Sequence, residues 1–109
     1  VYWARLRDLA AGGREIFFAT THFDNNRPSQ DLSAPLLQER TAPFVADHPV
    51  IVVGDFNSRP PSTAYATLTT DASRGFVFTN AFDLTDWRLV TNQEPAPAYD
   101  LDDRIDHIF

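Results

Sequence analysis

Three polar clusters stand out in the sequence, at residues 21–24 (Thr-His-Phe-Asp), 54–57 (Gly-Asp-Phe-Asn) and 104–107 (Arg-Ile-Asp-His), and the first two directly follow apolar runs. Four β-branched residues precede the second cluster, so Asp55 and Asn57 follow a core strand. Residues two positions apart in extended backbone point to the same side. We therefore expect a carboxylate and a carboxamide, a base and a neutral donor, at the strand end where α/β proteins place ligand sites. The alternative is that residues 55–61 form only a turn, since Asp, Asn, Ser and Pro favour turns.

The runs between the clusters predict a small sheet. Residues 1–7 and 15–21 are rich in apolar and aromatic side chains and predict two strands joined as a hairpin. Residues 50–54 lack polar alternation, which is typical of a strand buried on both faces. A last strand is expected over residues 104–109.

Two helices are expected between these strands. The first starts at Ser29 or Ser33 and runs to about His48, with a kink or break at Pro43. The second covers residues 63–68 and starts at Pro61 or Ser62. Residues 76–82 predict a loop or a short strand, and the proline-rich residues 94–99 predict irregular structure.

The composition restricts the function. The 109 residues carry a formal charge of −6, with no cysteine and no lysine, so disulfides and thiolate metal sites are excluded. Seven acids between Asp83 and Asp106 face only two arginines. This balance argues against sequence-independent binding of duplex nucleic acid, which requires a basic footprint. No apolar run is long enough to span a membrane, and nothing in the sequence indicates a cellular compartment or a protein partner.

The three clusters, in this order and at about this spacing, resemble the endonuclease/exonuclease/phosphatase superfamily with the deoxyribonuclease-I-like fold. Gly-Asp-Phe-Asn at 54–57 is the most specific mark. The resemblance implies an α+β sandwich, a partial four-layer fold with mixed β-sheets and outer helices. It also implies that residues 1–109 are a single partial domain, with the metal-binding glutamate upstream and a Ser-Asp-His motif downstream of the chain.

The resemblance assigns roles to four residues. Asp55 matches the aspartate that positions or deprotonates the attacking water, and Asn57 matches the asparagine that holds the phosphate or that water. His22 matches the histidine that donates to a phosphate oxygen. Asp106 matches the aspartate that orients the catalytic histidine, whereas His107 is expected to be structural, because strand alternation points it to the opposite face.

By this resemblance the chain belongs to a metal-dependent hydrolase of phosphoester bonds, a phosphodiesterase, phosphatase or nuclease. Mg²⁺ or Mn²⁺ is the expected cofactor; Asp55 and Asn57 could be secondary ligands, and the principal ligand is outside the chain. The acidic balance favours small-molecule or lipid-linked phosphoesters over nucleic acid. The alternative is a non-catalytic phosphate-binding remnant or interaction module of the same fold. Without the missing motifs, residues 1–109 alone are expected to be inactive.

Overall fold

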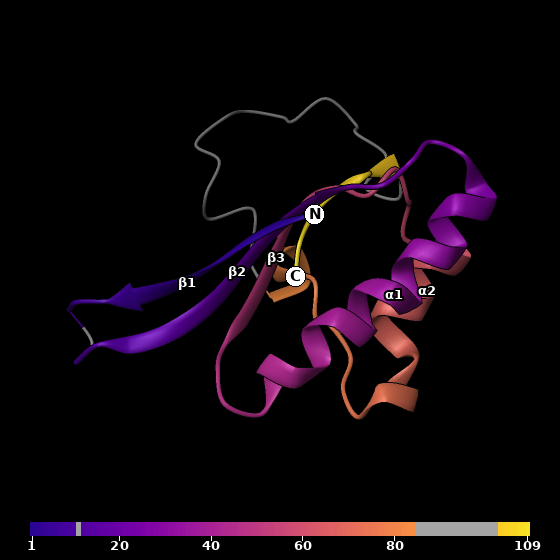
Figure 1. Cartoon of the computed structure of the whole chain (residues 1–109). Coiled ribbons are helices and arrows are strands. Elements are labelled where there is room, and N and C mark those ends of the chain that lie inside the picture. Colours follow the sequence, from indigo (N-terminus) through magenta and orange to yellow (C-terminus); the bar gives the residue numbers. More distant parts are fainter. Residues whose placement is uncertain (11, 85–102) are drawn as a thin grey trace, which may run out of the picture.

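A computed structural model of the chain describes residues 1–10, 12–84 and 103–109. A four-stranded sheet carries both described α-helices on one side, where the two helices lie against each other (Figure 1). The proline-rich residues 94–99 and most of the acidic stretch expected after Asp83 lie outside the described residues. Neither α-helix in the described part has the length and apolar character needed to cross a membrane.

The sheet is mixed. Strands β1 (Tyr2–Asp8) and β2 (Arg14–His22) form the expected antiparallel hairpin, and β3 (Val50–Asp55) runs parallel to β2. The short strand β4 (Asp106–Ile108) pairs antiparallel with β3, giving the order β1-β2-β3-β4. The parallel pair requires a crossover connection, which the first helix provides.

The crossover helix α1 (Arg27–Val45) is one continuous helix. It begins after Asn26, with Pro28 in the first turn, where a missing backbone N–H costs nothing. The expected starts at Ser29 and Ser33 are therefore wrong, because both residues already lie inside the helix.

The expected break at Pro43 is also wrong, since the helix contains both Pro35 and Pro43. Pro43 lies in the last turn, so only two residues follow it before the helix ends. The next residue, Phe44, stacks on Phe17 of β2 with ring centroids 4.2 Å apart. Packing of this end onto the sheet outweighs the local preference of proline.

The second helix, α2 (Thr63–Thr70), begins as expected after Ser62, whose hydroxyl accepts a hydrogen bond from the Tyr65 backbone N–H at 3.2 Å. It extends two residues beyond the expected end. Two short 3₁₀ turns follow, η1 (Ala72–Arg74) and η2 (Ala81–Leu84). Residues 76–80 between them form a loop and no strand.

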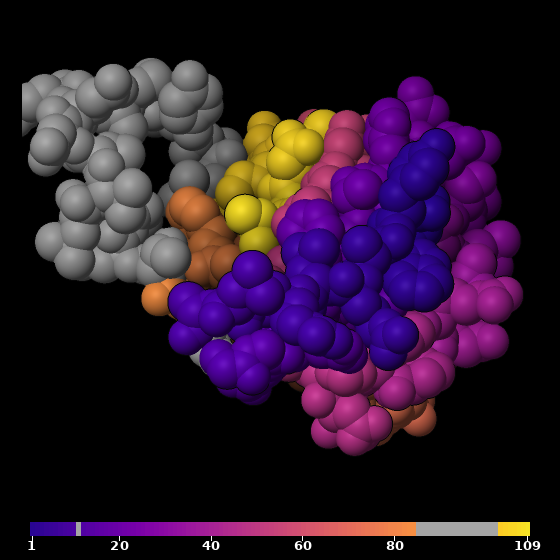
Figure 2. All heavy atoms as spheres, turned by 60° about the vertical axis from the view of Figure 1, so that its left-hand side comes forward, coloured from indigo at the N-terminus to yellow at the C-terminus, as the bar shows by residue number. Residues whose placement is uncertain are grey.

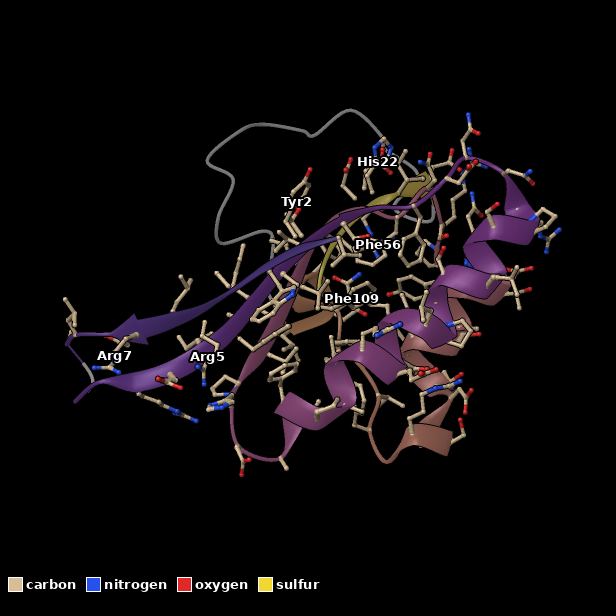
Figure 3. All side chains as sticks on the ribbon, viewed as in Figure 1. Tyr2, Arg5, Arg7, His22, Phe56 and Phe109 are labelled. Carbon is tan, nitrogen blue, oxygen red and sulfur yellow. The ribbon has the colours of Figure 1, made fainter. Side chains whose placement is uncertain are left out.

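The core lies between the sheet and the two helices. Its fully or nearly fully buried apolar side chains come from every described layer: Phe17, Ala19 and Val52 from the strands, Ala34, Leu37, Ala64 and Leu68 from the helices, and Phe56 and Phe109 beside the sheet. In Figure 3 the labelled Phe56 and Phe109 lie between the sheet and the helices. This one-sided core fixes the strand ends that carry the polar clusters.

Strand β3 differs from the expected strand buried on both faces. Val52 is fully buried toward the helices, whereas Ile51 and Val53 are only partly buried. Both described helices cover the same face, so the residues in register on the other face, including Tyr2 and Ile108, remain exposed. Figure 2 shows β1 and the C-terminal strand at the surface.

Candidate functional site

The strand register brings three of the expected site residues together. His22 ends β2 and lies opposite Asp55, which ends β3. Asp106 begins β4 and lies opposite Asp55 on its other side. Because residues paired across a sheet share a face, the three side chains stand in a row at one edge of the sheet. Figure 3 shows His22 at this edge, far from Arg5 and Arg7 at the hairpin end.

Within this row, the side chains of His22 and Asp55 are in contact. Nε2 of His22 lies 3.5 Å from Oδ2 of Asp55. The His22 side chain is 74% exposed and that of Asp55 is 34% exposed, so water screens this contact and it adds little stability. The imidazole is therefore free to turn toward a ligand at this edge.

Asn57 reaches the same edge by a route that strand alternation does not describe. Strand β3 ends at Asp55, and Asn57 has a positive φ of 47° in the turn beyond it. Its backbone N–H donates to Oδ1 of Asp55 at 2.8 Å, which closes an Asx turn. The expectation of two side chains leaving one extended strand is thus wrong, and the turn interpretation of this segment describes its backbone.

The carboxamide of Asn57 joins the ends of two strands. Its Nδ2 donates to the Phe23 carbonyl oxygen at 2.8 Å. Because a carbonyl oxygen can only accept, this bond places the nitrogen toward Phe23 and leaves Oδ1 on the other side. The backbone N–H of Phe23 in turn donates to the Asp55 carbonyl at 2.9 Å. These bonds lock the turn of β3 to the end of β2.

An open cavity of ≈ 540 Å³ lies over this edge. Its walls consist of the expected His22, Asp55 and Asn57 together with Phe23, Asp24 and Asn25. Phe23, Asp24 and Asn25 were not predicted as site residues, because Asp and Asn at these positions are typical of a turn. The Asn26 N–H does donate to Oδ1 of Asp24 at 2.8 Å, as in such a turn. Their position directly after His22 was the only available signal.

The described residues meet the needs of a divalent cation only in part. No group of three or more His, Asp or Glu side chains in the described part of the chain is arranged to hold a metal ion. Oδ1 of Asp55 already accepts a hydrogen bond from the Asn57 N–H, so Oδ2 is the carboxylate oxygen left for a cation. Since Mg²⁺ binds oxygen and keeps several waters, Asp55 and Asn57 fit as members of a ligand set completed by other groups.

His107 points away from this cavity, as expected from its position next to Asp106. Its side chain is 3% exposed and bonds to neither Asp55 nor Asn57. Nε2 lies 2.8 Å from the Ser58 carbonyl oxygen, and Nδ1 lies 2.9 Å from Nδ2 of Asn80. The carbonyl requires a proton on Nε2, so Nδ1 accepts from Asn80 and the ring is neutral.

Burial lowers the pKa of His107 below its ordinary 6.5, and the Arg104 charge adds to this, against the opposing bond to Ser58. Below about pH 6.5, His107 therefore takes up a proton more readily in the unfolded chain than in the folded chain. The free energy of unfolding consequently decreases as the pH falls through this range. We expect unfolding by denaturant to show a smaller loss between about pH 7.5 and about pH 5.5 in His107→Gln than in the wild type. An equal loss in both proteins would contradict this.

One family model and several solved structures match the chain. A family model described as the endonuclease/exonuclease/phosphatase family matches residues 3–109. No curated protein sequence matches the chain.

Several solved structures share the fold, among them the following three. A family protein from Bacteroides thetaiotaomicron is 23% identical with a TM-score of 0.72, over 97% of this chain and 38% of its own. A relative from Bacteroides vulgatus is 28% identical with a TM-score of 0.68, over 97% of this chain and 41% of its own. The human Nocturnin catalytic domain is 21% identical with a TM-score of 0.54, over 99% of this chain and 46% of its own.

The matches settle the fold and the family. The expected deoxyribonuclease-I-like α+β fold is confirmed by the structural neighbours. The chain spans less than half of each of the three structures. The match over residues 3–109 shows that the chain belongs to the endonuclease/exonuclease/phosphatase family, a superfamily of phosphoesterases and nucleases.

Proposed function

We propose that this chain supplies the phosphate-handling part of a metal-dependent phosphoesterase, and that residues 1–109 are one part of a single larger domain. The observation that carries the proposal is the row His22, Asp55 and Asp106, held in register on three adjacent strands. His22 and Asp55 also line the open cavity of ≈ 540 Å³, which has room for a phosphoester group, whereas Asp106 does not line it. Family membership supports the same class of reaction.

Each side chain has a chemical task in this proposal. Oδ1 of Asp55 is held by the Asn57 N–H, so Oδ2 is the oxygen that positions an attacking water and accepts its proton. The exposed imidazole of His22 donates to a phosphate oxygen, where charge develops. Oδ1 of Asn57 receives the same water or approaches a cation.

Asp106 acts indirectly, because it would accept a hydrogen bond from a catalytic histidine outside this chain and fix its tautomer. A bound Mg²⁺ or Mn²⁺ would neutralise charge on the phosphoryl oxygens. Asp55 and Asn57 would contribute oxygen ligands to it. The low count of basic side chains favours a small or lipid-linked phosphoester over nucleic acid.

The test compares the full-length protein with the isolated chain. Full-length protein with Mg²⁺ or Mn²⁺ is expected to hydrolyse a nitrophenyl phosphodiester, and a chelator should abolish the turnover. Residues 1–109 alone should show none, because their described side chains do not complete a metal site. Circular dichroism of the isolated chain checks that it is folded.

Two outcomes would contradict these expectations. Inactivity of the full-length protein on phosphomonoesters, phosphodiesters and plasmid DNA would support the non-catalytic alternative. Metal-dependent turnover by the isolated chain that Asp55→Ala abolishes would show instead that the site is complete within these residues.

A further inference from the structure

The turn that follows β3 is held by hydrogen bonds within itself and by hydrogen bonds to neighbouring segments. Asn57 has a φ of 47°, in the left-handed region, which asparagine tolerates better than most residues other than glycine. The turn is closed by its own Asx bond and by the Ser58 hydroxyl, which donates to the Phe56 carbonyl at 2.8 Å. Both of these bonds are local and would move with the turn, whereas Nδ2 of Asn57 donates to the Phe23 carbonyl and the Phe56 N–H donates to the Ile105 carbonyl, both at 2.8 Å.

A further support from outside the turn comes from β4. The Nε2–H of His107 donates to the Ser58 carbonyl at 2.8 Å, across 49 residues of sequence. Ser58 is 1% exposed, so no water replaces this donor without opening the core. The bond therefore anchors the far end of the turn to a strand of the sheet.

The ring of His107 is itself fixed. Nδ1 of His107 accepts from Nδ2 of Asn80 at 2.9 Å. Nδ2 of Asn80 also donates to the Tyr65 hydroxyl of α2 at 3.2 Å. Oδ1 of Asn80 accepts from the Phe82 N–H at 3.0 Å, which fixes the orientation of the amide. Asn80 is 2% exposed. Because every bond has one direction only, the network permits a single tautomer of His107.

Aromatic rings complete the enclosure. Phe56, Tyr65 and Phe109 lie around the imidazole with ring centroids 5.7, 5.0 and 5.4 Å away. Phe56 is the residue between Asp55 and Asn57, so it holds the middle of the turn against the same ring. Packing and hydrogen bonding by His107 thus hold the turn after β3 against strand β4.

We propose that His107 is a positioning residue that sets the placement of Asp55 and Asn57 through its hydrogen bond to the Ser58 carbonyl. Both faces of strand β4 then contribute to the site. Asp106 on one face lies beside Asp55, and His107 on the other face bonds to the turn. This inference rests on the proposed function for its effect on catalysis, whereas its effect on the turn is independent of any activity.

Two substitutions separate the donor from the ring. In His107→Gln the amide nitrogen reaches the place of Nε2 and keeps a donor for Ser58. In His107→Asn the shorter amide can still face Asn80, but nothing donates to Ser58. His48→Gln is the matched control, because His48 is a partly exposed histidine beyond the end of α1 and outside the network.

In the full-length protein, His107→Asn is expected to lower kcat by about 10-fold or more with little change in KM, as for other groups that orient a site from behind. His107→Gln should recover most of the rate, and His48→Gln should equal the wild type. Equal losses in the Gln and Asn variants would assign His107 a merely structural role.

Nuclear magnetic resonance tests the turn without any assay. The backbone and side-chain amide signals of Asn57 should shift in His107→Asn and remain in place in His107→Gln and His48→Gln. In the wild type, His107 should carry its proton on Nε2, with slow exchange. A proton on Nδ1 of His107 in the wild type, or unchanged Asn57 signals in His107→Asn, would overturn the proposal. Both results are independent of whether the protein hydrolyses a phosphoester. If His107→Asn does not fold, the position of the proton on His107 in the wild type decides.

Discussion

Replacing Asp55 by asparagine in the full-length protein is expected to lower kcat by at least about 10²-fold and to leave the fold intact. The Asn57 N–H donates to Oδ1 of Asp55, so the amide oxygen of the new side chain takes this place. The amide nitrogen then replaces Oδ2, the oxygen beside His22. A proton acceptor becomes a proton donor with almost no change of shape.

Asp24→Asn is the matched control. Asp24 lines the same cavity, and its carboxylate accepts only the Asn26 N–H among the hydrogen bonds found in the described residues. Steady-state kinetics of both variants with a nitrophenyl phosphodiester should therefore show a large loss at 55 and a small one at 24. Near-wild-type turnover of Asp55→Asn would show that another group handles the proton.

Gly54→Ala is expected to destabilise the protein by about 3 kcal/mol or more, or to prevent folding, because backbone strain and overpacking each cost about 1–3 kcal/mol. Gly54 has a φ of 146°, a conformation essentially restricted to glycine. A Cβ at this position would overlap the backbone carbonyl oxygen of Thr21 on β2. Backbone cannot rotate away as a side chain can, so β2 and β3 would have to separate.

Gly75→Ala is a comparison variant at a glycine with positive φ and no steric clash. Gly75 has a φ of 86°, but a Cβ there meets no atom within 4 Å. It should cost only the strain of a left-handed alanine, about 1–2 kcal/mol. Denaturant unfolding of both variants measures the difference, which contains the steric clash and the additional backbone strain of alanine at a φ of 146°. Similar losses at the two glycines would mean that β2 and β3 accommodate the methyl group, and the close approach of the strands would then not require glycine.

The effect of Gly54 extends to the site. Gly54 pairs with Thr21 in the parallel ladder, one residue before His22 pairs with Asp55. The close approach at the glycine therefore places the histidine beside the carboxylate. We expect any folded Gly54→Ala protein to lose the His22–Asp55 contact.

The sequence by itself determined the elements whose signals are local. Alternation and apolar runs predicted the hairpin and β3, and Ser62 before residues 63–68 predicted the start of α2, because a cap is a property of a few neighbouring residues. Asp106 was expected inside a strand over residues 104–109 and instead begins β4, whereas the positions of His22 and Asp55 at the ends of strands followed from the same runs. Their common edge follows once β2 and β3 are parallel neighbours.

Only the tertiary structure decided how Asn57 and His107 are held. The left-handed turn at Asn57 depends on the Phe23 carbonyl, 34 residues away, and His107 meets Asn80 across 27 residues and Ser58 across 49. Likewise α1 continues to Val45 past Pro43 while Phe44 packs on Phe17 of β2. Local propensity is worth fractions of a kcal/mol per residue, whereas these contacts exist only after distant segments have packed, so no local pattern encodes them.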